Sequence, residues 1–157
     1  MSNILVFAEQ RDGQLKSYAL EAISEGRCLA DGAGGTLSVC VIGAGITDLG
    51  ATIGSYGADK ILMADDAGLA VYSPGGYAKL LSDALSSSSA EVVLLSSSAM
   101  GRELGAILAA KADASLLSDV VETTWDGDHL VVKRPIYAGK AFLRVAAKKA
   151  PVLVTLR

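Results

Sequence analysis

The stretch that decides the fold is residues 4–42, ILVFAEQRDGQLKSYALEAISEGRCLADGAGGTLSVCVI. It opens on Ile4–Phe7, a continuous apolar run that is typical of a strand covered on both faces. From Leu15 onward the apolar residues recur at helical spacing, and the glycines at positions 32, 34 and 35 end the predicted helix. A second buried strand, Leu37–Ile42, follows. The order strand, helix, strand predicts a parallel sheet with helices packed on both faces.

Strands and helices keep alternating up to Ser118. The apolar patterns predict a short helix, a strand, a helix, a strand and a helix at residues 47–56, 60–64, 73–85, 91–95 and 102–112. The second of these helices has the clearest start, because Ser73 is placed to cap it and Pro74 suits its first position. Small residues, Ser96–Gly101, form the turn before the last helix.

The final quarter of the chain has a different pattern. Val120–Trp125 is predicted to be a strand, and Asp126-Gly127 is a strong hairpin-turn signal that leads into a return strand, Leu130–Ile136. Two more strands are predicted at Lys140–Ala147 and Pro151–Leu156. We therefore expect the chain to finish with antiparallel strands that lie beside the parallel sheet or extend it.

The composition indicates one globular domain, residues 1–157. The chain is 51% hydrophobic and 20% charged, with a formal net charge of -3 and a mean hydropathy of +0.41. This apolar content excludes a disordered chain. No apolar run approaches the roughly 18 residues of a membrane span. No basic block favours nucleic-acid binding.

The cysteines and the N-terminus indicate a reducing compartment. Cys28 and Cys40 have no second cysteine or histidine at metal-ligand spacing, so we expect two buried, reduced thiols. The first strand follows Met1 with no leader sequence between them. We expect a cytoplasmic protein, with the mitochondrial matrix as the alternative in a eukaryote.

Residues that could carry catalysis are scarce. The single histidine, His129, lies next to the predicted hairpin turn, where we expect solvent exposure, and no Ser–His–Asp set can be assembled around it. Asp65-Asp66 follows a strand, so it indicates either a metal site or a solvated loop that caps the next turn. We expect no enzyme activity from this chain.

Two glycine-containing turns are candidate phosphate sites. Gly43-Ala44-Gly45 carries part of a dinucleotide fingerprint, but a tight strand-to-helix turn explains it equally well. In the turn Ser96–Arg102, small residues open a helix and Arg102 adds a positive charge, which suits a phosphate. The candidate cofactor-binding residues are therefore Ser98, Gly101 and Arg102. The alternative is plain turn packing, with Arg102 on the surface or at an interface.

The segment Val131–Ala141 concentrates cations in a lightly charged chain. Arg134, Tyr137 and Lys140 surround a proline and a glycine that favour an irregular backbone. Arginine and tyrosine are enriched where protein surfaces meet, so we predict that these three residues lie at an interface. The alternative is a solvated strand edge that its lysines protect from aggregation.

Taken together, six segments make the chain resemble the N-terminal domain of the electron transfer flavoprotein alpha subunit. These segments are Ile4–Glu9, Gly54–Lys60, Tyr72–Pro74, Gly101–Leu104, Ser118–Val120 and Arg134–Ala141. Each segment alone is weak support for the family, but six segments in the right order are specific to it. The match extends from the first predicted strand to the last.

The resemblance implies a fold, a partner and a cofactor. The fold is an adenine-nucleotide-alpha-hydrolase-like, Rossmann-like α/β sandwich of three layers with a mostly parallel sheet and C-terminal antiparallel strands. The alpha subunit forms a heterodimer with a beta subunit, which usually holds AMP, or a second flavin in electron-bifurcating relatives. FAD in the C-terminal alpha domain carries electrons from acyl-CoA and other dehydrogenases to a quinone-linked acceptor.

The sequence stops at Leu156-Arg157, where the resemblance places the start of the flavin domain. No flavin-binding residue carries over, so we expect FAD in the full-length assembly and none in this chain alone. The first hypothesis is a scaffold that docks the beta subunit. The alternative is a free-standing nucleotide-binding module like the universal stress proteins. These usually carry a glycine-rich phosphate loop after the fourth strand, where this chain has Ser96–Gly101 with one glycine.

Overall fold

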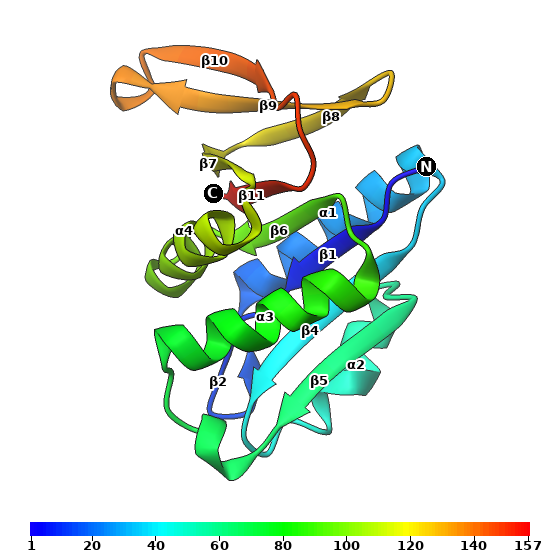
Figure 1. Ribbon diagram of the computed structural model, residues 1–157, viewed down its shortest axis with the longest axis vertical. Coiled ribbons are helices and arrows are strands. Elements are labelled where there is room, and N and C mark those ends of the chain that lie inside the picture. The colour runs from blue at the N-terminus through cyan, green and yellow to red at the C-terminus, as the bar shows by residue number, and fades with distance from the viewer.

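Six parallel strands form the central sheet in the computed structural model, which describes all 157 residues (Figure 1). Their order across the sheet is β5 (Lys60–Asp65), β4 (Leu37–Gly43), β1 (Ile4–Phe7), β6 (Val92–Ser96), β11 (Val152–Leu156) and β7 (Ser115–Val120). From β1 the chain moves outward through β4 to β5, and then crosses back to β6 on the other side of β1. The strand order therefore reverses between β1 and β6.

Helices cover both faces of this sheet and bury a hydrophobic core on each. One face is covered by α1 (Ser17–Ala33) and α2 (Leu49–Ser55), and the other by α3 (Pro74–Ser88) and α4 (Ala99–Ala112). Strand β1 shows the arrangement clearly. Ile4 and Val6 point into the core under α1, whereas Leu5 and Phe7 point into the core under α3 and α4. The predicted three-layer α/β architecture is confirmed.

A small antiparallel sheet, which we call the arm, stands on the α1 side of β7 and β11 (Figure 1). It contains β8 (Glu122–Asp126), β9 (His129–Ile136) and β10 (Ala141–Ala146), with the 3-10 turn η2 (Tyr137–Gly139) between the last two. The Trp125 indole N–H donates to the Leu29 carbonyl of α1 at 3.0 Å. Leu130 and Val132 are buried in the core that α1 covers. The arm is therefore part of the folded unit.

Three short elements complete the chain. They are the hairpin β2 (Gln10–Arg11) and β3 (Gln14–Leu15) and the 3-10 turn η1 (Ala67–Leu69). The first residue of α3 is Pro74, and the Ser73 hydroxyl accepts a hydrogen bond from the Gly76 N–H, as predicted. No helix of this structure is both long and apolar enough to cross a membrane.

The last strand departs from the prediction. We expected residues 151–156 to be antiparallel, but β11 lies inside the main sheet and pairs in parallel with both β6 and β7. The arm replaces the usual helix in the crossover from β7 to β11, so the chain returns in the same direction. Val152–Val154 is buried on both faces, which is typical of an inner parallel strand.

The predicted strand Val120–Trp125 is in fact two strands. β7 ends at Val120 in the main sheet and β8 begins at Glu122 in the arm. Asp119 has a left-handed φ of 60°, which breaks the regular pleat just before this change of sheet. The hairpin turn is also shifted by one residue. Its central residues are Gly127 and Asp128, and only Gly127 has a positive φ, which is typical of a type II′ turn.

Candidate functional site

The C-terminal edge of the parallel sheet is the first place to look for a ligand. In open α/β sheets, ligands bind at this edge where the strand order reverses. In this chain the reversal lies between β1 and β6, so the relevant residues are Glu9, which follows β1, and Ser96–Ser98 at the end of β6.

The Glu9 side chain occupies this reversal point. It is only 4% exposed and accepts a 2.7 Å hydrogen bond from the Tyr18 hydroxyl and a second one from the Ser98 hydroxyl. Burial, reinforced by the hydrogen bond to Glu9, raises the pKa of Tyr18 to about 12. Glu9 therefore places a carboxylate beside the start of α4, and helix starts favour the binding of anions.

The three candidate cofactor-binding residues lie together at this helix start, and two of them have structural roles. Ser98 caps α4, since its hydroxyl accepts from the Gly101 N–H at 2.9 Å. Gly101 allows close packing, because a Cβ at this position would lie 1.9 Å from the Ser96 carbonyl oxygen. Arg102 is exposed, and its Nε makes a long 3.4 Å contact with the Ser98 carbonyl.

A cleft of about 570 Å³ opens beside these residues. It is lined by Tyr18, Ser96, Ser97, Ser98, Arg102, Ser118, Asp119, Leu156 and Arg157. Asp119 accepts two hydrogen bonds from the Arg157 guanidinium, at 2.9 and 3.0 Å. The Asp119 N–H donates to the Thr155 hydroxyl at 3.0 Å. Most of the lining residues carry a hydroxyl or a charged group, and several of these groups already have hydrogen-bond partners within the chain.

Sequence reasoning assigned no role to Glu9, Tyr18, Asp119 or Arg157. Glu9 and Asp119 do belong to the segments that carry the family resemblance, and this was the only signal that could have drawn attention to them. Tyr18 and Arg157 have no such signal, because their partners lie 9 and 38 residues away in the sequence.

Asp65 fills the other candidate phosphate turn, which contains Gly43-Ala44-Gly45. Its carboxylate accepts hydrogen bonds from the N–H groups of Gly45, Ile46 and Thr47, at 2.8 to 3.1 Å, and from the Thr47 hydroxyl at 2.8 Å. The Thr47 hydroxyl, followed by the Gly45 N–H, holds the pKa of Asp65 below its usual value. Asp66 accepts from the Gly68 N–H and so caps η1. Asp66 thus caps a local turn, whereas Asp65 fills the β4–α2 turn, 18 to 20 residues earlier in the chain.

Two other features noted in the sequence have plain structural roles. In the segment Gly54–Lys60, Asp59 accepts from the Leu37 N–H and from the Arg27 guanidinium, both at 2.8 Å. These bonds lower the pKa of Asp59 and join α1 to the sheet. Cys40 is buried, which raises the pKa of its thiol to about 12. Cys28 was expected to be buried but is exposed on α1, because it faces away from the sheet.

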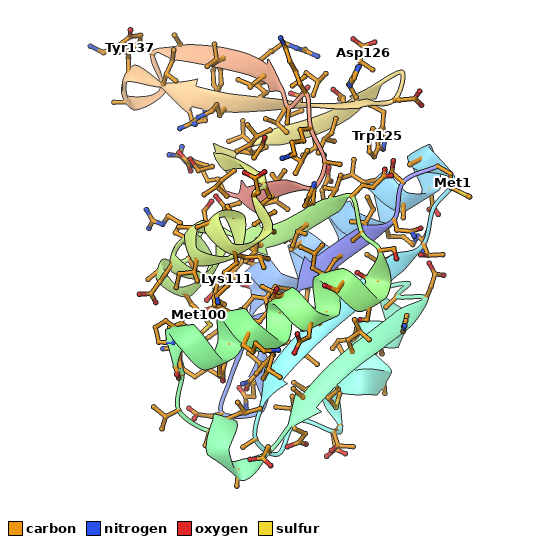
Figure 2. The ribbon with its side chains drawn as sticks, viewed as in Figure 1. Met1, Met100, Lys111, Trp125, Asp126 and Tyr137 are labelled. Carbon is orange, nitrogen blue, oxygen red and sulfur yellow. The ribbon has the colours of Figure 1, made fainter.

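Of the three expected interface residues, Tyr137 lies at the free end of the arm (Figure 2). Tyr137 is 78% exposed at the tip, with a left-handed φ of 49°. Lys140 is exposed beside it. Arg134 is half-buried on β9, on the same side as Val132, and its Nε is buried without a hydrogen-bond partner. His129 is exposed at the opposite end of the arm, as predicted.

Comparison with known proteins identifies the family. Residues 4–157 match the electron transfer flavoprotein domain. The electron transfer flavoprotein subunit alpha of Bacillus subtilis is 34% identical over 154 residues, which are 98% of this chain and 47% of the relative. The acryloyl-CoA reductase electron transfer subunit beta of Anaerotignum propionicum is 38% identical over 117 residues, 74% of this chain and 32% of the relative.

A third relative has the same coverage as the first. The electron transfer flavoprotein subunit alpha of Clostridium acetobutylicum is 32% identical over 157 residues, which are 98% of this chain and 47% of the relative. The chain spans about half the length of the curated alpha subunits that it matches. Because the family match extends over nearly every residue, this chain belongs to the electron transfer flavoprotein domain family.

Proposed function

We propose that this chain is the docking scaffold of an electron transfer flavoprotein alpha subunit. The arm engages the beta subunit, and the FAD that carries electrons is held outside these residues. In the assembled protein, acyl-CoA or other dehydrogenases supply electrons and a quinone-linked acceptor receives them, in the cytoplasm or a mitochondrial matrix. The observation that carries the proposal is the exposed tip, Tyr137 and Lys140, on an arm that projects from the body.

The residues of the sheet edge do not fit the pyrophosphate of FAD. Such a group needs free backbone N–H donors at a turn or a helix start. Asp65 takes three N–H groups of the β4–α2 turn. At the start of α4, Ser98 takes the Gly101 N–H and the Glu9 carboxylate lies close by. We therefore assign no flavin contact to this chain.

The same contacts weigh against the nucleotide-binding alternative. Arg102 lines the cleft and carries a positive charge that a phosphate could use. However, the buried carboxylate of Glu9 contacts the same turn and would repel that phosphate. The universal-stress-protein-like function is therefore the weaker hypothesis.

The docking proposal is tested by the double substitution Arg134→Ala with Tyr137→Ala in the full chain. We expect far-UV circular dichroism to show an unchanged fold, because neither side chain belongs to a hydrophobic core. Titration against the electron transfer flavoprotein beta subunit of the same organism should show binding weaker by about 2 kcal/mol or more, as for hot-spot residues. The matched control is Arg11→Ala with Tyr56→Ala, which are exposed on the body.

Either of two results would count against the proposal. Loss of the fold would make Arg134 and Tyr137 structural residues. Unaltered affinity with an intact fold would make the tip a solvated strand edge. The position of the flavin is tested separately by an absorption spectrum of protein purified without added flavin. A stoichiometric yellow chromophore would show that these residues do bind it.

A further inference from the structure

The charges of this chain are strongly segregated. Residues 129–149 contain six of its 14 lysines and arginines and none of its 17 acidic residues. The rest of the chain therefore has eight basic and 17 acidic side chains, a formal net charge of -9. Four of the six cations, Lys133, Arg134, Lys140 and Arg144, lie on β9, β10 and the turn between them, so this part of the arm is basic. Three of the 17 acidic residues lie on β8 and the β8–β9 turn of the same arm.

Most of these cations are not neutralised within the chain. Lys133 pairs with Glu122 at 3.3 Å, and Lys149 pairs with Asp113. The other four form no ion pair, and they are Arg134, Lys140, Arg144 and Lys148. Lys140 and Arg144 are exposed at or near the tip. Their charge is available to a partner.

One side of the arm combines this charge with exposed apolar surface. Strand alternation and the β9–β10 register place Lys133, Pro135, Phe142 and Arg144 on the side opposite buried Val132, which we call the outer face. Phe142 is 55% exposed, and the Lys133 ammonium lies 4.9 Å from the centre of its ring. An aromatic centre with a charged rim is the usual anatomy of a protein interface.

We propose that the outer face docks an acidic protein surface that offers an apolar pocket to Phe142, and that this surface belongs to the beta subunit. The inference rests on the proposed docking function and adds to it the chemistry of the partner and the contributions of Phe142 and Arg144. Lys140 and Arg144 attract the partner over a distance, and Phe142 holds it after contact.

A protein partner fits better than a nucleic acid or an anionic membrane. The arm is polarised, because Asp126 lies at the opposite end from Tyr137 and Glu122 shares the outer face with Lys133 (Figure 2). A long polyanion would meet these carboxylates and the other acidic residues outside positions 129–149, a part of the chain whose formal net charge is -9. A protein surface can match the cations and avoid the carboxylates.

The test is a kinetic one, made with the full chain and the purified beta subunit. We expect the association rate constant to fall about tenfold between 50 and 500 mM NaCl, because salt screens electrostatic steering. At low salt, Lys140→Gln with Arg144→Gln should lower this rate constant by about tenfold. Phe142→Ser should instead raise the dissociation rate constant by about tenfold, because it removes the apolar anchor.

The matched control is Lys60→Gln with Lys111→Gln, which removes the same charge from exposed positions on the body. It should change the association rate constant less than about twofold, because rate enhancement depends on where the charge lies. If the beta subunit binds but neither salt nor the arm variants change the kinetics, the inference is wrong and the docking proposal stands. If the unmodified chain does not bind the beta subunit, both are wrong.

A competition experiment addresses the polyanions directly. Single-stranded DNA of 20 nucleotides and vesicles of phosphatidylserine with phosphatidylcholine are the probes. Binding of either one as tight as that of the beta subunit, and lost with Lys140→Gln and Arg144→Gln, would overturn the assignment of an acidic protein partner. Absence of such binding supports it.

Discussion

Glu9 and Asp65 are two carboxylates that take up the donors of turns where α/β proteins often receive phosphate. Asp65 bonds three consecutive N–H groups, and Glu9 accepts the hydroxyl that caps α4. Each oxygen atom satisfies a polar group that would otherwise need water or a ligand. At the scale of single residues, the chain completes these turns with its own side chains.

Alkaline pH should weaken this arrangement through Tyr18. The folded protein keeps the phenol proton up to about pH 12, whereas the unfolded chain releases it near pH 10.0. The folded state thus binds more protons in this interval, so the free energy of unfolding falls as pH rises from 10 to 12. Denaturant titrations of Tyr18→Phe should show a smaller fall. Tyr137→Phe is the control at an exposed position and should behave like the unmodified protein. If the free energy of unfolding falls equally with pH in all three proteins, the Tyr18 explanation is wrong.

Gly101→Ala should destabilise the start of α4. The added methyl group would lie 1.9 Å from the Ser96 carbonyl oxygen, so the helix must move away from β6. We expect the free energy of unfolding to fall by about 1–3 kcal/mol, as for other overpacked sites. Gly75→Ala is the control, because a Cβ there meets open space. Equal melting temperatures for the two variants would show that the close approach of residue 101 to the Ser96 carbonyl does not affect stability.

At the scale of elements, the arm takes the place of a crossover helix. The hairpin turn at Gly127-Asp128 joins β8 to β9 and allows them to pair as antiparallel strands. Gly127 has φ of 59°, in the left-handed region that favours glycine. The chain then returns along β10 and enters the main sheet as β11. The arm therefore connects the exposed tip to an inner strand of the sheet.

Gly127→Val should cost about 1 kcal/mol or more, because a β-branched residue is strained at positive φ. Thermal melting followed by circular dichroism measures this change. Gly127→Asn should cost less, since asparagine tolerates left-handed backbone. If the valine and asparagine variants melt at the same temperature as the unmodified protein, backbone strain at position 127 does not affect stability.

At the scale of the whole molecule, internal hydrogen bonds occupy the turns at the sheet edge, whereas the tip of the arm is open to solvent. We expect calorimetric titration with AMP and ATP to give weak or no binding, because the Glu9 carboxylate lies beside the helix start that a phosphate needs. A micromolar dissociation constant, about -8 kcal/mol, would favour the nucleotide-binding function instead. Far-UV circular dichroism of the same preparation checks that the protein is folded.

Much of the fold can be predicted from the sequence because its signals are local. The run Ile4–Phe7 is apolar at every position and is buried on both faces of the sheet. Ser73 and Pro74 start α3 through contacts within three residues. The alternation of such units predicted the parallel sheet, and the family resemblance agrees with the match over residues 4–157.

The tertiary structure alone decided how distant segments meet. Ser98 bonds Glu9 across 89 residues, and Asp65 bonds the Gly45 turn across 20 residues. Strand β11 lies between β6 and β7, although its sequence is compatible with either direction of pairing. Propensity, periodicity and capping depend on neighbours a few residues apart. Strand order, the filling of the turns and the outer face of the arm depend on which surfaces the whole chain buries together.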